Sequence, residues 1–214
     1  MHTYVLVEGH GEVEAVLNLL TRLAQELGVH LPPFAKPYRA SLLGRETLVR
    51  HVESVRADRD AGALLLLRDA EDGCPKTDAP PLGDHLRAQK LPFPSAVVLA
   101  YREYESLFLP CVELMAGRAL PGPGGARPGL RPDARYEGDF EAKRGVKEWL
   151  SQHMAPRRAY KPRVDQLPFT RMVDFAVVRE KGLPWFGSLE RALRFLAANL
   201  GQAGTAYPPS ARQP

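Results

Sequence analysis

Acidic side chains that follow apolar segments are the groups with which this sequence could do chemistry. Glu8, Asp69 and Glu105 each come directly or shortly after a segment rich in aliphatic, β-branched and aromatic residues. The three segments are residues 3–7, 63–67 and 95–101. Carboxylates that are brought together repel one another unless a cation lies between them. Oxygen ligands without neighbouring histidine or cysteine favour Mg²⁺, Mn²⁺ or Ca²⁺ over Zn²⁺.

Further acids lie beside the first two of these residues. Glu12 follows Glu8 in the first turn of an expected helix, and Glu71 and Asp72 follow Asp69. A single acid after a strand is usually a helix cap or a solvated loop residue, so the coincidence at three strand ends carries the inference. One group can hold a metal while another moves a proton or holds a second ion. We therefore predict a site for Mg²⁺ or Mn²⁺ with the ligands Glu8, Glu12, Asp69, Glu71, Asp72 and Glu105.

Alternating strands and helices must bring these acids together. The unbroken aliphatic run 63–67 is typical of a central parallel strand that helices cover on both faces. A βαβ alternation implies parallel strands and right-handed crossovers. In such sheets ligands bind outside the carboxyl ends of the strands, where the acids would lie. Apolar residues at helical spacing predict helices at about residues 13–28, 44–58, 82–89, 106–114, 141–153, 164–178 and 186–200.

The predicted fold is α/β and Rossmann-like, with a mainly parallel sheet flanked by helices. Residues 1–115 form its α/β core, and residues 140–201 form a helical part of the same domain that packs on the sheet. Residues 116–139 are rich in Gly, Pro and Arg and predict an exposed loop, which could gate the substrate or be an insertion without a role. Residues 202–214 lack periodicity and predict a flexible tail.

Charge and cysteine content narrow the class of protein. The chain has 214 residues, a formal net charge of +4 and a pI near 9.2. The basic excess of its second half suits phosphate recognition beside a metal, and a solvated surface is the alternative explanation. Two cysteines are too few for a disulfide framework. With no signal peptide or membrane span in the sequence, we expect a cytoplasmic protein without membrane contacts.

Several common catalytic patterns do not occur in the sequence. The glycines at positions 9 and 11 lack both the third glycine of a dinucleotide fingerprint and the Lys-Ser/Thr of a phosphate-binding loop. A Gly-x-Ser-x-Gly elbow, which would indicate a serine hydrolase, is missing. His10 could touch a substrate or metal, although a surface position is the more ordinary reading. The acids remain the candidate catalytic groups.

The acidic segments resemble the motifs of TOPRIM domains, the catalytic fold of topoisomerases, primases and OLD-type nucleases. Residues 7–12, Val-Glu-Gly-His-Gly-Glu, resemble the first motif, and residues 67–72 are similar to the Asp-x-Asp motif. Glu71 stands where the family usually has Asp, and Asp72 is available as a substitute ligand. Residues 101–109 resemble a segment of small bacterial TOPRIM-like proteins that are often found beside ATPases. Further similarities to that group are Lys143, Tyr160 with Lys161, Asp165 with Gln166, and Ser188 with Leu189.

The resemblance implies a Mg²⁺- or Mn²⁺-dependent nuclease acting on DNA or RNA, alone or with an ATPase partner. Glu8 would bind metal or act as general acid or base, and Asp69 would hold one or two ions with its neighbours. Lys143 could stabilise charge on the transferred phosphate, or it could belong to a solvated helix face. The competing hypothesis is a non-catalytic TOPRIM-like module that binds an ATPase. A third is a phosphatase or receiver-like site with Asp69 as nucleophile, which leaves the Glu8 loop unexplained.

Overall fold

The computed structural model describes residues 1–9, 11–35, 37–39, 45–122 and 124–210, and its centre is a parallel sheet. Among these described residues, five strands pair in the order β2-β1-β3-β4-β7, and every pairing is parallel. The mainly parallel α/β architecture predicted from the sequence is thus confirmed. The strands are β1 (His2–Val7), β2 (Tyr38–Arg39), β3 (Ala61–Asp69), β4 (Ser95–Ala100) and β7 (Ala206–Tyr207).

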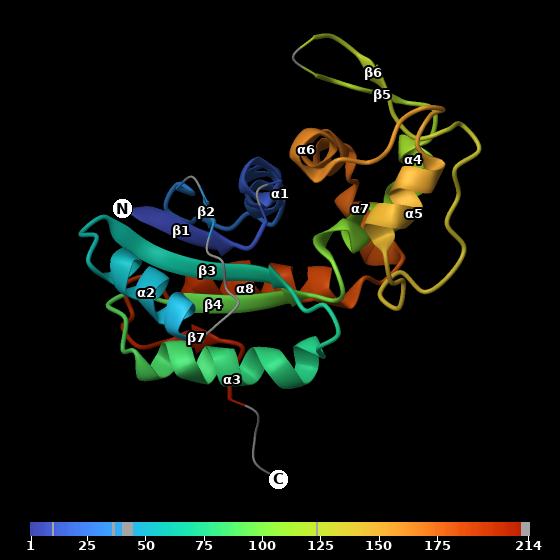
Figure 1. Ribbon diagram of the computed structural model, residues 1–214. Coiled ribbons are helices and arrows are strands. Elements are labelled where there is room, and N and C mark those ends of the chain that lie inside the picture. The colour runs from blue at the N-terminus through green and yellow to red at the C-terminus, as the bar shows by residue number, and fades with distance from the viewer. Residues whose placement is uncertain (10, 36, 40–44, 123, 211–214) are drawn as a thin grey trace.

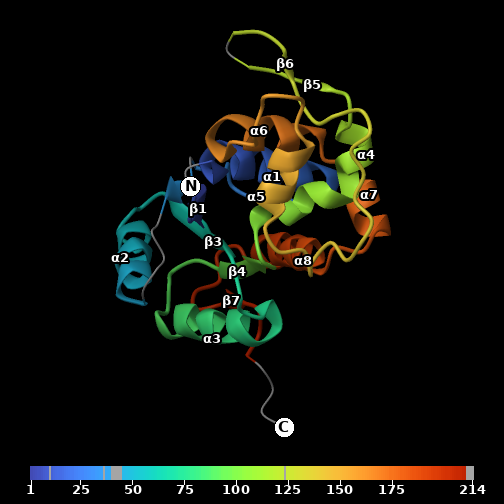
Figure 2. The same ribbon diagram turned by 45° about the vertical axis from the view of Figure 1, so that its right-hand side comes forward.

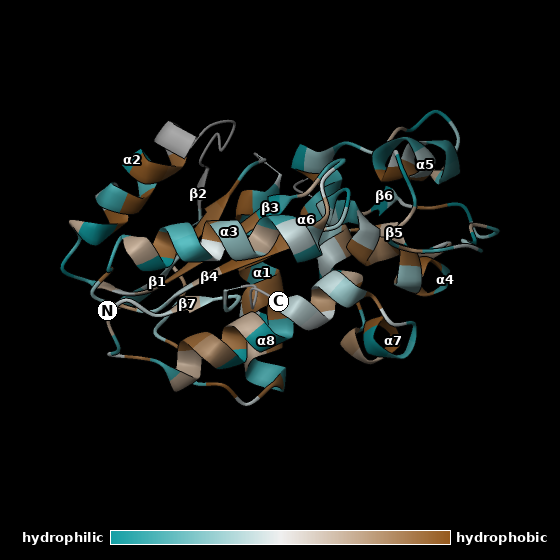
Figure 3. Ribbon diagram, turned by 90° about the horizontal axis from the view of Figure 1, so that it is seen from below, coloured by the Kyte–Doolittle hydropathy of each residue, from teal (hydrophilic) through white to brown (hydrophobic). Residues whose placement is uncertain are grey.

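Strand β3 runs through the middle of the sheet, and this position accounts for its aliphatic sequence. Leu65 and Leu67 belong to the apolar core beneath α1 and α8, whereas Leu64 and Leu66 belong to the core beneath α2 and α3. Because both faces are covered, each of these side chains is buried and the strand needs no polar alternation. Figure 1 shows α1 above the sheet and α3 below it, and the hydrophobic colour follows the central strands in Figure 3. The covering helices are α1 (Glu12–Glu26), α2 (Arg45–Arg56), α3 (Pro75–Ala88) and α8 (Pro184–Ala198).

The second half of the chain gathers beyond the carboxyl ends of the strands. Figure 1 shows α4, α5 and α7 at that end of the sheet, with α6 beside α1. Arg22 of α1 donates hydrogen bonds of 2.8 and 2.7 Å to the carbonyls of Thr170 and Val173, which tie α6 to α1. The elements of this half are the 3₁₀ helix η1 (Tyr104–Cys111), α4 (Val112–Met115), β5 (Ala119–Leu120), β6 (Arg127–Pro128), α5 (Val146–His153), α6 (Pro162–Met172) and α7 (Phe175–Glu180).

Helix α3 begins earlier than the sequence predicts. Prolines and glycine at residues 73–80 predict a loop, yet α3 starts at Pro75 and continues through Pro80 and Pro81. Pro75 stands at the start of the helix, where its missing N–H would have no intrahelical partner. Asp78 accepts a hydrogen bond of 2.8 Å from the Cys74 backbone N–H and fixes this first turn. Burial of one helix face against the sheet then outweighs the unfavourable propensity of the inner prolines.

Two segments predicted to be irregular contain strands. In residues 116–139, β5 and β6 pair as an antiparallel hairpin, and Leu120, Leu130 and Ala134 are buried. The predicted tail contains β7, which pairs with β4 through Ala206 and Tyr207. These strands have two residues each, too few to show a period of two in the sequence. Residues 211–214 of the tail and His10 lie outside the described part of the chain.

The C-terminal helices also differ from their predicted boundaries. The helix expected over 141–153 begins at Val146, and the helix expected over 164–178 is two helices separated at Val173 and Asp174. The last helix begins at Pro184, two residues before its predicted start, and the Ser188 hydroxyl within it lies 3.1 Å from the Tyr207 hydroxyl. Within the described residues, no helix is long and apolar enough to cross a membrane.

Candidate active site

The glycines of the first acidic loop make room for side chains. Glu12 is 7% exposed at the start of α1, and its Oε2 accepts a hydrogen bond of 3.2 Å from the Glu8 backbone N–H. A Cβ on Gly9 would lie 2.6 Å from Glu12 Oε1, and a Cβ on Gly11 would lie 2.2 Å from Gln166 Oε1. Any larger residue would therefore displace the Glu12 carboxylate or separate α1 from α6. The two glycines therefore leave the space in which the Glu12 carboxylate lies and in which α1 meets α6.

Asp69 ends β3 and is held by the segment that follows β4. Its Oδ1 accepts a hydrogen bond of 2.8 Å from the Tyr104 backbone N–H, and its side chain is 14% exposed. Burial raises the pKa of the Asp69 carboxyl well above its usual range, and the negative charges of Glu12 and Glu105 raise it further. The parallel pairing of β3 with β4 places Asp69 beside Ala100, so the two strand ends meet as predicted.

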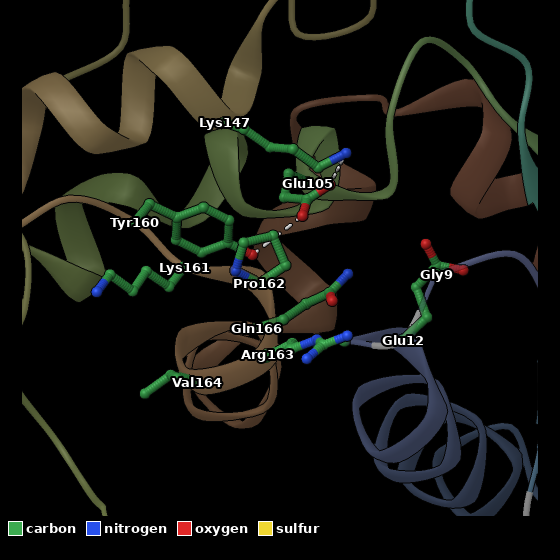
Figure 4. A pocket seen from close by; sticks show the side chains of 11 residues that line it. Gly9, Glu12, Glu105, Lys147, Tyr160, Lys161, Pro162, Arg163, Val164 and Gln166 are labelled. Atoms are coloured by element: carbon green, nitrogen blue, oxygen red, sulfur yellow. Dashed lines mark hydrogen bonds and ion pairs between the residues drawn. The ribbon is translucent and has the colours of Figure 1, made fainter.

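Glu105 is buried, and two side chains from the second half of the chain contact it. The Tyr160 hydroxyl donates a hydrogen bond of 3.1 Å to Oε1, and Lys147 Nζ lies 3.4 Å from Oε2. Burial raises the pKa of Glu105 to about 7, although the nearby Lys147 ammonium opposes the shift. Figure 4 shows both contacts as dashed lines.

Lys147 joins the acids of β3 and η1. Its Nζ also lies 3.5 Å from Glu103 Oε2 and 3.8 Å from Asp69 Oδ2. Burial by itself lowers the pKa of this ammonium, but the negative charges of Glu105, Asp69 and Glu103 outweigh burial and raise it. Lys147 is therefore a fixed positive charge among carboxylates.

A cavity of about 590 Å³ lies between this group and α1. In Figure 4, Glu12 enters it from the α1 side, while Lys147, Glu105 and Tyr160 enter from the opposite side. The start of α6 completes the wall with Lys161, Pro162, Arg163, Val164 and Gln166. The cavity thus combines recessed carboxylates with exposed cationic side chains at its edge.

The structure brings together some of the predicted site residues and separates others. The negative charges of Glu12 and Glu105 raise the pKa of Asp69, and that of Glu12 also raises the pKa of Glu105. The backbone N–H of Glu8 is hydrogen-bonded to Glu12. Glu71 and Asp72 lie in the exposed turn after β3, outside this group.

Their placement has a local cause. Glu71 takes a left-handed backbone conformation with φ of +48°, and Arg102 donates a hydrogen bond of 2.8 Å to Asp72 Oδ1. Asp72 also contacts Arg144, and its side chain is 77% exposed. The turn after β3 therefore carries both acids to the surface, so the structure gives no support to their prediction as metal ligands.

Lys147, rather than Lys143, is the lysine at the carboxylates. The helix does not reach back to Lys143, because α5 begins at Val146 after Gly145 in a left-handed conformation with φ of +63°. Within the part of the chain that the structure describes, Lys143 makes no ion pair with these acids. The prediction of a helix over residues 141–153 that carries Lys143 is therefore wrong at its start.

Sequence reasoning missed other members of the site. Glu103 lies two residues before Glu105, so the Glu-x-Glu spacing was a signal in the sequence. Tyr160, Lys161 and Gln166 stood out through the resemblance alone, without a predicted role. The sequence around the start of α6, a Tyr-Lys pair followed by proline, contains no pattern that would place this helix opposite the first acidic loop.

The donor chemistry of the site fits a hard divalent cation. Glu12, Asp69 and Glu105 offer buried carboxylate oxygens from three elements, and their raised pKa values reflect burial and repulsion that such a cation would relieve. Among the described residues, no three His, Cys, Asp or Glu side chains already converge at metal-binding distance. The residues thus fit Mg²⁺ or Mn²⁺ by type and burial.

Comparison with known proteins places the chain in a family. Searches of curated proteins and of solved structures return no match. A family model described as Domain of unknown function (DUF4276) matches residues 7–194, a range that contains the first acidic loop, Asp69, Glu105 and Lys147. Because this match covers most of the sequence, the chain belongs to the DUF4276 family.

Proposed function

We propose that this protein is a Mg²⁺- or Mn²⁺-dependent nuclease that hydrolyses phosphodiesters of DNA or RNA. The observation that carries the proposal is the grouping of Asp69 and Glu105 around Lys147, beside a cavity that Glu105, Lys147 and Glu12 line. The carboxylates come from α1, β3 and η1, at the edge of a parallel sheet where ligands bind. The resemblance of residues 7–12 and 67–72 to TOPRIM motifs supports the same chemistry.

Each side chain has a role that follows from its position. Asp69, Glu105 and Glu12 would hold the metal, which when bound supplies positive charge to the phosphate and activates water. Lys147 lies where it can stabilise negative charge on a phosphate oxygen. Tyr160 orients Glu105 through its hydrogen bond. Glu8 stays the predicted general acid or base beside this group.

The cationic edge of the cavity favours a phosphate-containing substrate. Lys161 and Arg163 line the cavity and are exposed, so their charges are available to a ligand. Recessed acids alone would repel a phosphodiester, and the cations offset that repulsion for the flanking phosphates. A polyanion such as DNA or RNA therefore suits the cavity better than a neutral ligand.

A non-catalytic module that binds an ATPase is the second candidate. The observation that favours it is the Lys147 ammonium, which neutralises part of the acidic charge without a metal. In either case the proposed setting is the cytoplasm; the module requires an ATPase partner, whereas the nuclease would act alone or with one. The two candidates differ in whether the protein needs a divalent cation.

Cleavage with matched variants separates these candidates. Supercoiled DNA, single-stranded DNA and RNA are incubated with Mg²⁺, Mn²⁺, Ca²⁺ or EDTA, using wild type, Asp69→Asn and Asp133→Asn. Asp133 is an exposed acid outside the cavity and gives the same chemical change as a control. We expect cleavage with Mg²⁺ or Mn²⁺ by wild type and Asp133→Asn, and none by Asp69→Asn. Equal cleavage by Asp69→Asn would refute the assignment of the site.

A further inference from the structure

A second hollow, which adjoins the carboxylate cavity, runs along α6. Its volume is about 390 Å³, and it shares Arg163 and Val164 with the first cavity. Its walls come from α1, α6 and the segments around β5 and β6. Figures 1 and 2 both show the β5–β6 hairpin projecting beyond α6. A chain-like ligand could pass from one hollow into the other over Arg163.

The arginines of this groove have a regular arrangement. Arg163, Leu167 and Arg171 are four residues apart on α6 and therefore share one helix face. Arg163 and Arg171 are exposed, and a rise of 1.5 Å per residue separates them by about 12 Å along the helix. That length spans more than one phosphate of a nucleic-acid strand. The spacing suits contacts to a phosphate backbone.

Arg127 is the third arginine of the groove, and the fold holds it in place. Its Nη2 donates a hydrogen bond of 3.0 Å to the Val164 carbonyl, and its Nη1 lies 3.4 Å from Asp165 Oδ1. Asp165 is fully buried and is also bonded to Arg158 at 2.7 Å. A Cβ on Gly122 would lie 2.7 Å from Arg127 Nε, so a larger residue there would displace the Arg127 side chain.

The groove combines positive charge with an apolar floor. Glu14 is the acid that lines it beside the three arginines, and Leu167 and Pro168 supply apolar contact. This combination is suited to a nucleic-acid strand whose phosphates meet guanidinium groups while its bases contact apolar surface. The recessed acids favour an unpaired strand, because Glu105 is 1% exposed and Glu12 7% exposed. An unpaired strand can follow the cavity without giving up base pairs, whereas distortion of a duplex costs stacking and pairing energy.

We infer that a single nucleic-acid strand lies across both hollows, with its scissile phosphate at the carboxylates and its flanking phosphates on Arg163, Arg171 and Arg127. The inference rests on the proposed function for the position of the scissile phosphate. It adds the substrate class, an unpaired strand, and the face of the protein that holds it. Arg171 lines the groove and lies outside the carboxylate cavity, so it tests the groove separately.

The test is fluorescence anisotropy of a labelled oligothymidylate in EDTA across a range of salt concentrations. Arg171→Glu should weaken binding by about tenfold and lower the slope of log K against log salt by about 0.7, the value for one phosphate contact to a single strand. Arg171→Lys should keep the slope. Arg194→Glu is the matched control, since Arg194 is an exposed arginine on α8. Circular dichroism checks that each variant is folded.

Three results would overturn the inference: equal binding by Arg171→Glu and Arg194→Glu, no binding by wild type, or tighter binding of a blunt duplex than of the single strand. Hydrolysis of bis(p-nitrophenyl) phosphate by wild type with Mn²⁺ tests the proposed function independently. If wild type hydrolyses this small diester while Arg171→Glu binds the strand normally, the groove is wrong and the nuclease proposal stands. If the strand binds as expected and no hydrolysis occurs, the groove stands and the nuclease proposal fails.

Discussion

Two clusters of ion pairs lie near the carboxyl end of β3, and they differ in how far they are exposed to solvent. In the inner group, Lys147 contacts both Asp69 and Glu105, and the Glu105 side chain is 1% exposed. In the outer group, Asp72 contacts Arg102 and Arg144 and remains 77% exposed. Burial shifts the pKa of the inner acids upward, whereas water screens the outer pair. The difference teaches that burial, more than proximity in sequence, selects which acid can do chemistry.

The largest expected effect comes from Asp69→Asn. The amide keeps an acceptor for the Tyr104 N–H but removes the negative charge, so metal-dependent cleavage should fall by roughly 10³-fold or more. Initial rates on single-stranded DNA with Mn²⁺ measure this effect. The thermal midpoint in EDTA should stay within a few degrees of wild type, which separates lost chemistry from lost fold. Retained cleavage would place the reacting group elsewhere.

Lys147→Met should have the next largest effect, and Lys143→Met in the same segment provides its comparison. Removal of the ammonium should lower cleavage by about 10²–10³-fold because a charge near the phosphate is lost. It should also destabilise the metal-free protein by about 1–2 kcal/mol at neutral pH, less than for a fully buried pair because Lys147 keeps 38% exposure. Urea unfolding measures the stability. Lys143→Met is the matched control, and a larger effect at Lys143 would contradict the placement of the site.

The pH dependence of stability tests the inner acids directly. The folded-state pKa of Glu105 is raised from 4.5 to about 7, so its contribution to stability is full below about pH 4.5 and is lost as the pH rises through about 7. Glu105→Gln cannot ionise and should lack this component. In EDTA, the stability of wild type relative to Glu105→Gln should therefore decrease from about pH 5 to about pH 8. Parallel curves for the two proteins would show that Glu105 is not shifted.

The smallest effect is expected from Asp72→Asn in the outer group. An exposed ion pair contributes about 0–1 kcal/mol, and salt screens it. The variant should change the free energy of unfolding by less than about 1 kcal/mol, with the difference shrinking at high salt. Cleavage should remain within about twofold of wild type. A loss of cleavage comparable to that of Asp69→Asn would restore Asp72 as a ligand and merge the two groups.

The sequence is most informative where burial and strand geometry act over short distances. The aliphatic run before Asp69 predicts a central strand because only a strand covered on both faces tolerates such a run. The strand prediction alone then places Asp69, the acid at its end, at the carboxyl edge of the sheet. Glu12 and Glu105 follow by the same logic from β1 and β4. The parallel sheet and these three members of the site were therefore predictable.

The remaining members depend on contacts between distant parts of the chain. Lys147 reaches the acids because Gly145 turns the chain just before α5, and a left-handed glycine has no periodic signal. Asp72 is removed from the site by Arg102, an arginine that the sequence separates from it by a whole helix. Strand β7 is too short to show a pattern, and its pairing with β4 is long-range. Local patterns cannot predict such contacts, since tertiary packing decides them.

Binding of Mn²⁺, followed by electron paramagnetic resonance of the free ion, tests the central claim most directly. Wild type and Asp72→Asn should bind the ion alike, and Asp69→Asn should bind it much more weakly, because the inner carboxylates are the proposed ligands. The same titration of Glu105→Gln should also show weakened binding. Equal binding by Asp69→Asn and wild type, or loss of binding in Asp72→Asn alone, would contradict a metal site at the buried acids.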